Sequence, residues 1–164
     1  MAGNLPGLPH LVGSSQRGRS KDEWMTKPAP RVLLRAEQTG GVLAVIELTG
    51  SGRPPLHRHE FDETFHVLEG KLTFQVGEHR LTRTTGQLAF APRGVPHTYA
   101  NLTRESARAL LICTPAGFER YFDRIAASIK VTELPPEAAG LIPEVFTVGP
   151  PLGDQPSDGR PKAT

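Results

Sequence analysis

Short runs of apolar residues, several of them alternating with polar positions, follow one another from residue 31 to residue 114. An alternation with a period of two places every second side chain on one face of a strand, so these runs predict β-strands. The predicted strands cover 31–37, 41–48, 64–70, 72–77, 87–92, 97–102 and 107–114. Glycine-containing turns separate most of them, and short strands at this spacing are typical of an antiparallel sandwich or barrel.

A different pattern begins at Thr114, in the stretch TPAGFERYFDRIAASIK. Its apolar residues recur at three- and four-residue spacing, which is the period of an amphipathic helix. Thr114 is a candidate cap, and Pro115 suits the first position of a helix. We therefore expect a helix that packs on the sheet or covers one end of the barrel, and a second short helical turn at 135–140.

The segments on either side of this core have a different composition. Residues 1–30 are rich in Gly, Pro, Ser and basic residues, and residues 150–164 are polar and rich in Pro and Gly. We predict an N-terminal arm over 1–30 that is ordered only in part, one β-domain with its helix over 31–149, and a disordered tail over 150–164. A chain of 164 residues suits a single domain with a substantial core.

Charge and composition exclude several classes of partner. The formal net charge is only +2, and no basic stripe is interleaved with aromatic residues, so we expect no nucleic-acid partner. No apolar run approaches 18 residues, and the first residues lack the order of a signal peptide, so we expect no membrane association. Cys113 is the single cysteine, which fits a reducing, cytoplasmic location and a small core residue.

His57, His59 and Glu63 lie close together in the stretch PPLHRHEFDETFHVLEG, residues 54–70. Residues two apart in an extended chain share a face, and the prolines favour extension, so both imidazoles are expected to point to one place. Two neutral nitrogens and one carboxylate oxygen suit Mn, Fe, Co, Ni or Zn. A solvated turn with assorted polar residues explains this stretch equally well when it is taken alone.

A second stretch, GQLAFAPRGVPHTYAN at residues 86–101, favours the metal site over the solvated turn. It resembles the second sequence motif of the cupin family at every fixed position, namely Gly86, Pro92, Gly94, His97 and Asn101. The stretch at 54–70 resembles the first cupin motif through His57, His59, Glu63 and Gly70. The leading glycine of that motif is replaced by Ser51, between two glycines, which affects the loop and none of the expected ligands.

The cupin resemblance implies a fold and a metal site. The fold is all-β: a double-stranded β-helix, or jelly-roll barrel, with a short C-terminal helical segment. Carried over by motif position, the metal ligands are His57, His59, Glu63 and His97. The expected cofactor is one divalent transition metal per chain, which the sequence leaves open among Ni, Mn, Fe, Co and Zn.

Outer segments resemble, less specifically, the small bacterial quercetin (flavonol) dioxygenases, in EQTGG, ERYFDRI and VGPPL. This resemblance implies a metal-dependent dioxygenase that acts on a flavonol-like or other enol-containing aromatic small molecule, with O₂ as co-substrate. Glu63 would then also be the catalytic base towards the substrate hydroxyl. The alternative is a non-oxidative cupin, either an isomerase or lyase or a small-molecule-binding protein without turnover.

Three aromatic residues, Phe65, Phe90 and Tyr99, are candidates for a substrate pocket in the barrel interior. Core packing explains each of them at least as well, and only Tyr99 carries a polar group near a ligand. A homodimer joined by sheet edges is also expected, because pairing would cover edges that are otherwise open.

Other polar residues of the first stretch are assigned secondary roles. Glu60 and Asp62 are candidate acceptors for an imidazole N–H, with solvated turn acids as the alternative. His66 has the opposite parity to Glu63 along the predicted strand, so we do not expect it to be a ligand.

Overall fold

The computed structural model describes residues 30–50, 52–126 and 144–153, and strands dominate this part of the chain. The strands are β1 (Arg31–Leu34), β2 (Ala44–Thr49), β3 (Leu56–Arg58), β4 (Asp62–Glu69), β5 (Lys71–Val76), β6 (His79–Thr84), β7 (Leu88–Ala91), β8 (His97–Ala100), β9 (Arg108–Thr114) and β10 (Phe146–Gly149). The helices are α1 (Ala36–Thr39) and α2 (Glu119–Ala126). The predicted all-β class is confirmed.

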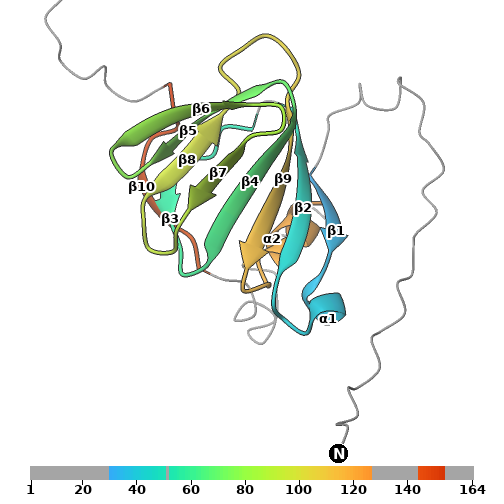
Figure 1. The fold of residues 1–164 in the computed structure, drawn as a ribbon. Helices are drawn as coiled ribbons and strands as arrows, with labels where there is room; N and C mark the ends of the chain where they lie inside the picture. Colours follow the sequence, from blue (N-terminus) through green and yellow to red (C-terminus); the bar gives the residue numbers. More distant parts are fainter. Residues whose placement is uncertain (1–29, 51, 127–143, 154–164) are drawn as a thin grey trace, which may run out of the picture.

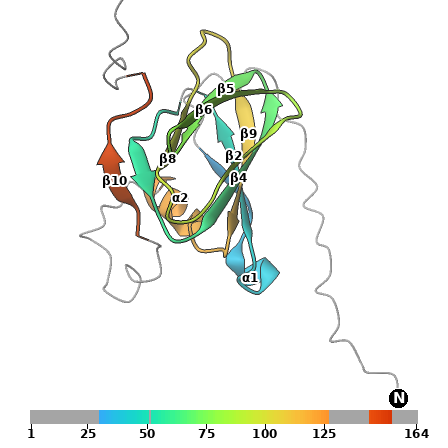
Figure 2. The ribbon, with the colours of Figure 1, turned by 60° about the vertical axis from the view of Figure 1, so that its left-hand side comes forward.

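The strands form two antiparallel five-stranded sheets that face each other across a barrel (Figures 1 and 2). The order in the first sheet is β1-β2-β9-β4-β7, and in the second it is β10-β3-β8-β5-β6. β1–β2 and β5–β6 are consecutive pairs, but most neighbours in each sheet are distant in sequence, as in a jelly roll: β4 pairs with β9, and β3 pairs with β8. The predicted cupin jelly roll is therefore confirmed.

The barrel interior follows from strict alternation along the strands. In β4, Glu63, Phe65 and Val67 are buried, while their neighbours in the strand are partly exposed. On β9, Cys113 lies directly opposite Glu63 and Leu111 opposite Phe65, and both are buried. The inward face of this sheet thus changes from apolar to charged at Glu63, towards one end of the barrel.

Three strands and one helical turn of the described residues are absent from the predicted elements, namely β3, β6, β10 and α1. β3 has only three residues and lies in the segment that was expected to be extended. β6 and β10 are edge strands whose residues are mostly exposed; β6 contains a single apolar residue and β10 has only four residues, so each gives a weak signal for a strand. α1 is a single turn that ends at Gly40, where a positive φ of 62° suits glycine. An exposed edge and a four-residue turn leave little hydrophobic signal in the sequence.

The predicted helix begins later than Thr114, which ends β9. α2 starts at Glu119, whose carboxylate is buried at 1% exposure. It accepts hydrogen bonds from the backbone N–H groups of Gly117, at 2.6 Å, and Ala36, at 3.1 Å. The Glu119 side chain therefore satisfies one backbone N–H group just before α2 and one at the start of α1. Thr114, the expected cap, is not involved in these two hydrogen bonds. The predicted turn at 135–140 lies outside the described residues.

The structure describes the first residues of the predicted tail, 150–153. β10 pairs with β3, and Leu152, which follows it, is only 1% exposed. The Arg53 guanidinium donates a hydrogen bond to the carbonyl oxygen of Leu152 at 2.9 Å. The domain therefore extends at least to residue 153. Residues 154–164 and the predicted arm over 1–29 lie outside the described residues.

The described part of the chain contains no helix that is both long and apolar enough to cross a membrane. β10 presents an apolar edge, since Val145, Phe146 and Val148 are exposed. Such an edge is compatible with self-association through strand pairing. The homodimer stays a prediction.

Candidate metal centre

The four expected ligands converge at one end of the barrel, from both sheets. His57 on β3 and His97 on β8 are cross-strand partners, and His59 follows directly in the turn to β4. Glu63 comes from β4 of the opposite sheet. One ligand atom from each of the four lies within 4.8 Å of the others, and the residues are only 0–7% exposed. The spacing of the two sequence motifs thus predicted a real cluster.

Each imidazole is oriented by a backbone carbonyl two residues away. Nδ1 of His57 lies 2.7 Å from the carbonyl oxygen of Pro55, and Nδ1 of His97 lies 2.8 Å from that of Val95. Nδ1 of His59 lies 2.9 Å from the carbonyl oxygen of Phe61. A carbonyl can only accept, so each Nδ1 carries the proton, and in the neutral ring the lone pair is on Nε2. The three Nε2 atoms are therefore the nitrogens available to a metal.

The donor atoms fit a bound transition metal. Nε2 of His59 is buried and has no hydrogen-bond partner, and its distance to a Glu63 oxygen is 3.4 Å. A metal with ligand bonds of about 2.0–2.2 Å spans at most about 4.4 Å between opposite ligands, so the cluster must contract only slightly. Three imidazole nitrogens and one carboxylate oxygen suit a first-row transition ion. Four protein ligands leave positions open in an octahedral sphere.

The electrostatics of the cluster favour a cation. Burial alone would raise the pKa of Glu63, but the neighbouring imidazoles of His59 and His97 outweigh burial and lower that pKa to about 2. Burial lowers the pKa of His57, which keeps its imidazole neutral. Burial also acts against the charge of His97, but the contact with Glu63, 3.2 Å between Nε2 and the carboxylate, raises its pKa overall. Glu63 thus supplies a buried negative charge at neutral pH.

An ion pair and a backbone hydrogen bond join the two sequence motifs. Asp62 accepts from the backbone N–H of Arg93 at 2.8 Å and from its guanidinium at 2.7 Å. The N–H of Gly94 donates to the carbonyl oxygen of His59 at 2.7 Å. Asp62 therefore links the two motifs through Arg93, in what we call the Asp62–Arg93 clamp. It is not an imidazole acceptor, which corrects the sequence-based expectation. Glu60 is exposed, and the acceptors for the imidazoles are backbone carbonyls.

A column of aromatic rings begins at one ligand and ends on α2. The ring of Phe61 stacks on the His59 imidazole, with centroids 3.5 Å apart and planes 4° from parallel. Phe118 packs on Phe61 at 4.9 Å, and Tyr121 stacks on Phe118 at 5.2 Å. Sequence reasoning missed the role of Phe61, although its place two residues after His59 was a usable signal. The expected packing of the helix against the barrel is confirmed for Tyr121 and Phe122, which pack on the core cluster.

Two of the three candidate pocket residues, Phe65 and Tyr99, pack on each other, and the third lies elsewhere. Phe65 is 2% exposed and packs on Phe74 and on Tyr99, with centroid distances of 5.1 and 5.3 Å. Phe90 is 55% exposed, on the outer face of β7, where Ala89 and Ala91 point inward instead. The expectation that Phe90 lines the interior is therefore wrong.

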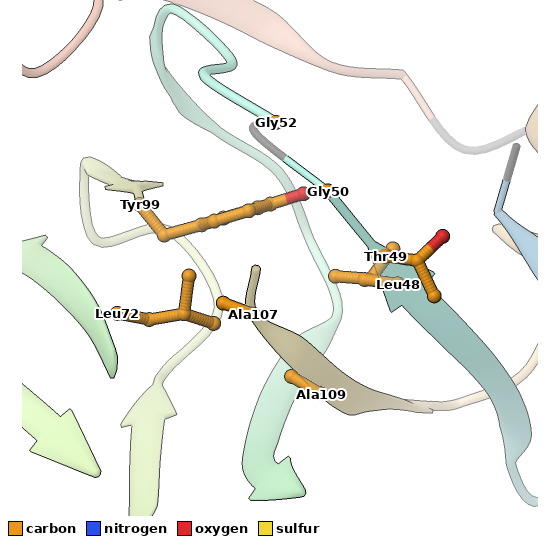
Figure 3. Close-up of a pocket in the computed structure, with 8 residues that line it drawn as sticks. All are labelled: Leu48, Thr49, Gly50, Gly52, Leu72, Tyr99, Ala107 and Ala109. Carbon is orange, nitrogen blue, oxygen red and sulfur yellow. The ribbon is translucent and has the colours of Figure 1, made fainter. Parts of the chain in front are cut away.

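Tyr99 reaches a small cavity on the side of the aromatic cluster away from the ligands. Its ring crosses this space and its hydroxyl points toward Gly50 and Gly52 (Figure 3). A Cβ atom at Gly52 would lie 3.0 Å from that hydroxyl oxygen, so glycine makes the close approach possible. Burial raises the pKa of Tyr99 above its ordinary range, so the phenol stays protonated. The other residues that line this cavity are Leu48, Thr49, Leu72, Ala107 and Ala109.

One protein family and several solved structures are similar to this chain. Residues 44–113 match the Cupin domain family. Among solved structures, TT1209 from Thermus thermophilus is similar, with 27% identity, coverage of 53% of this chain and 82% of that chain, and a TM-score of 0.46. The polyketide cyclase RemF from Streptomyces resistomycificus has 24% identity over 52% and 63% of the two chains, with a TM-score of 0.46.

The EutQ protein of Clostridium difficile has 19% identity over 56% of this chain and 64% of that chain, with a TM-score of 0.45. A search of curated proteins found no match. The matched segment 44–113 contains all four clustered residues and β2 to β9 of the barrel. Residues 44–113 are therefore similar to a cupin domain, and the barrel that they help to form holds a buried cluster of three histidines and one glutamate suited to a metal ion.

Proposed function

We propose that this protein is a metal-dependent cupin dioxygenase that acts on a flavonol-like or other enol-containing aromatic small molecule. The observation that carries the proposal is the buried set of three imidazole nitrogens and one carboxylate with an unpartnered Nε2 at His59. When bound, one divalent transition metal would supply Lewis acidity and open positions for small molecules. The four residues that would hold it are His57, His59, Glu63 and His97.

The role of Glu63 in the proposal is to accept a proton from the substrate hydroxyl. A carboxylate has two oxygens, so one can hold the cation while the other faces the substrate. Burial at 3% exposure keeps bulk water from competing for that proton. The Asp62–Arg93 clamp holds the two motifs that carry the ligands in a fixed relation, which limits reorganisation during the reaction.

A non-oxidative cupin is the second candidate, and one contact favours it. The two oxygens of Glu63 lie 3.4 and 3.2 Å from Nε2 of His59 and His97, so both face ligand nitrogens. A carboxylate held in this way suits a site that polarises or binds a small molecule without abstracting its proton. An isomerase, a lyase or a binding protein would all fit this arrangement.

The experiment that tests the proposal measures oxygen consumption by the metal-reconstituted protein with a panel of flavonols and other enols. The matched variant is Glu63→Gln, refilled with metal and checked for occupancy. An amide oxygen can coordinate but cannot accept the proton, and general-base help is worth about 10²–10⁴ in rate. We expect at least about a hundredfold loss of turnover, which shrinks at higher pH where the substrate is already deprotonated.

Two results would contradict parts of this proposal. Near-wild-type turnover by metal-filled Glu63→Gln would remove the base from the mechanism. Substrate turnover without oxygen consumption, or binding without turnover by the wild-type protein, would establish the non-oxidative alternative. His66→Ala is the control, because His66 lies on the outward-facing side of the strand that carries Glu63 and should leave turnover unchanged.

A further inference from the structure

We infer that Phe61 is a positioning residue for the metal centre: its ring and its backbone carbonyl together fix the orientation of His59. This inference rests on the proposed metal site. It concerns a residue that would touch neither the metal nor a substrate and that would act only through His59.

Two independent contacts from Phe61 reach the same imidazole. The carbonyl oxygen of Phe61 accepts from Nδ1 of His59 at 2.9 Å, which fixes the rotation of the ring in its own plane. The phenyl ring lies parallel to the imidazole, with centroids 3.5 Å apart, and fixes its tilt. His57 and His97 have the carbonyl contact alone from a residue two positions away, Pro55 or Val95, whose side chain offers no ring of this kind.

The ring stack stabilises the metal-bound form more than the metal-free form. An imidazole that gives electron density to a cation becomes more positive, and a positive group over the face of an aromatic ring is attracted to it. Phe61 is 2% exposed and His59 is 0% exposed, so water does not weaken this attraction. The stack therefore contributes to metal affinity as well as to geometry.

Phe61 is in turn held by Phe118, the residue directly before α2. Phe118 packs on the ring of Phe61 at 4.9 Å, whereas its centroid is 6.1 Å from His59. Phe118 is 7% exposed and belongs to the buried core that includes Phe61. A change at Phe118 should therefore reach His59 in attenuated form, through Phe61.

The test compares Co²⁺ binding by the wild-type protein, Phe61→Leu, Phe61→Tyr and Phe74→Leu. Affinity is measured by competition with a chelator, and the visible absorption of bound Co²⁺ reports the ligand geometry. Changes around a ligand typically cost 10–100-fold in metal affinity. We expect about a tenfold or greater loss and an altered spectrum in Phe61→Leu, and recovery to within about threefold of wild type in Phe61→Tyr.

Phe74→Leu is the matched control for general damage to the core. Phe74 is 1% exposed, and its ring partners are Phe65 and Tyr99. This variant should lose stability in chemical denaturation of the metal-free protein, yet keep the wild-type Co²⁺ affinity and spectrum. An equal loss of affinity in Phe74→Leu and Phe61→Leu would overturn the inference, as would wild-type affinity and spectrum in Phe61→Leu.

If Phe61→Leu does not fold, Phe118→Leu tests the inference that Phe61 orients His59. It should lose affinity by about threefold, less than the range for direct neighbours of a ligand. Unchanged affinity and spectrum in Phe118→Leu would then overturn the inference. A wild-type protein that binds no Co²⁺ would instead refute the metal site itself, and with it this role of Phe61.

Discussion

Glu63 and the three histidines meet at one point, but the two sheets hold them in different ways. Glu63 lies on β4, an eight-residue strand paired with β9 on one side and with β7 on the other. His57 lies on β3, a three-residue strand whose register with β8 is the single pair of His57 and His97. His59 lies beyond the end of that strand.

This difference shows two solutions to the same positioning problem. A long ladder fixes a side chain by register alone, because a slip of one residue would turn every inward side chain outward. β3 is too short for a ladder of this kind, whereas β8 pairs with β5 over four residues that include His97. In addition, each imidazole is fixed by a carbonyl of its own segment at 2.7–2.9 Å. Strand pairing therefore positions Glu63, and local hydrogen bonds contribute most where pairing is weakest, at His57 and His59.

The largest expected effect comes from removing ligands on the short-strand side. The double variant His57→Ala and His97→Ala leaves one imidazole and one carboxylate, so stoichiometric metal binding should be lost. The loss should exceed the 10–100-fold that is typical of changes around a ligand. Elemental analysis after dialysis against the metal measures it, with His66→Ala as the control that keeps a full equivalent. A full equivalent bound equally tightly by the double variant would place the metal elsewhere.

A smaller effect, which depends on pH, tests the coupling between Glu63 on the first sheet and His97 on the second. Glu63 raises the pKa of His97, so protons compete with metal there from above the ordinary histidine value of about 6.5, whereas burial lowers the pKa of His57. Wild-type affinity should therefore fall as the pH drops from 8 to 5, by up to about tenfold per unit for each proton displaced.

Glu63→Gln removes the cause of the raised His97 pKa. Its affinity should be weaker at pH 8, and the further decline should begin at a lower pH than in the wild-type protein. Zn²⁺ affinity measured by chelator competition at half-unit steps shows both changes. Coincident pH midpoints in the two proteins would contradict the coupling between Glu63 and His97.

The smallest effect is expected at the clamp between the motifs. Arg93 lowers the pKa of Asp62 to about 2, so the ion pair contributes fully above the ordinary carboxyl value and is lost only as pH falls through about 2. Its contribution is thus constant between pH 5 and 8. Because the pair is largely exposed, Asp62→Asn should weaken Zn²⁺ binding by only about threefold. Glu60→Gln is the control on the same bend, and an equal loss there would remove any special role of the clamp.

Much of the fold and all four clustered residues were predictable from the sequence. The alternation in β4 and β9 identified the central ladder, and the fixed spacings of the two motifs identified His57, His59, Glu63 and His97. These features are local, because each depends on residues that are close together in one or two strands. The predicted fold class follows from the same signal.

The inward face of β7 was not predictable from hydrophobicity. Phe90 was expected inside because it is large and apolar, but Ala91 lies opposite Glu63 and Ala89 lies opposite Phe65. The interior there is already filled by the ligand cluster and the ring of Phe65, so only small residues fit. The position of Cys113 beside Glu63 likewise depends on the register of β9 against β4, which no local pattern contains.

The pairing of β3 has a consequence for the order in which the site is assembled during synthesis. β3 receives its partner β8 about forty residues later in the chain, and its other edge is covered only by β10, whose register places Thr147 opposite His57. A nascent chain that has not reached residue 149 would carry His57 on an open strand edge, at the time when unpaired edges are most prone to misassociation. Capture of a metal by the complete set of ligands therefore belongs to a late stage of folding.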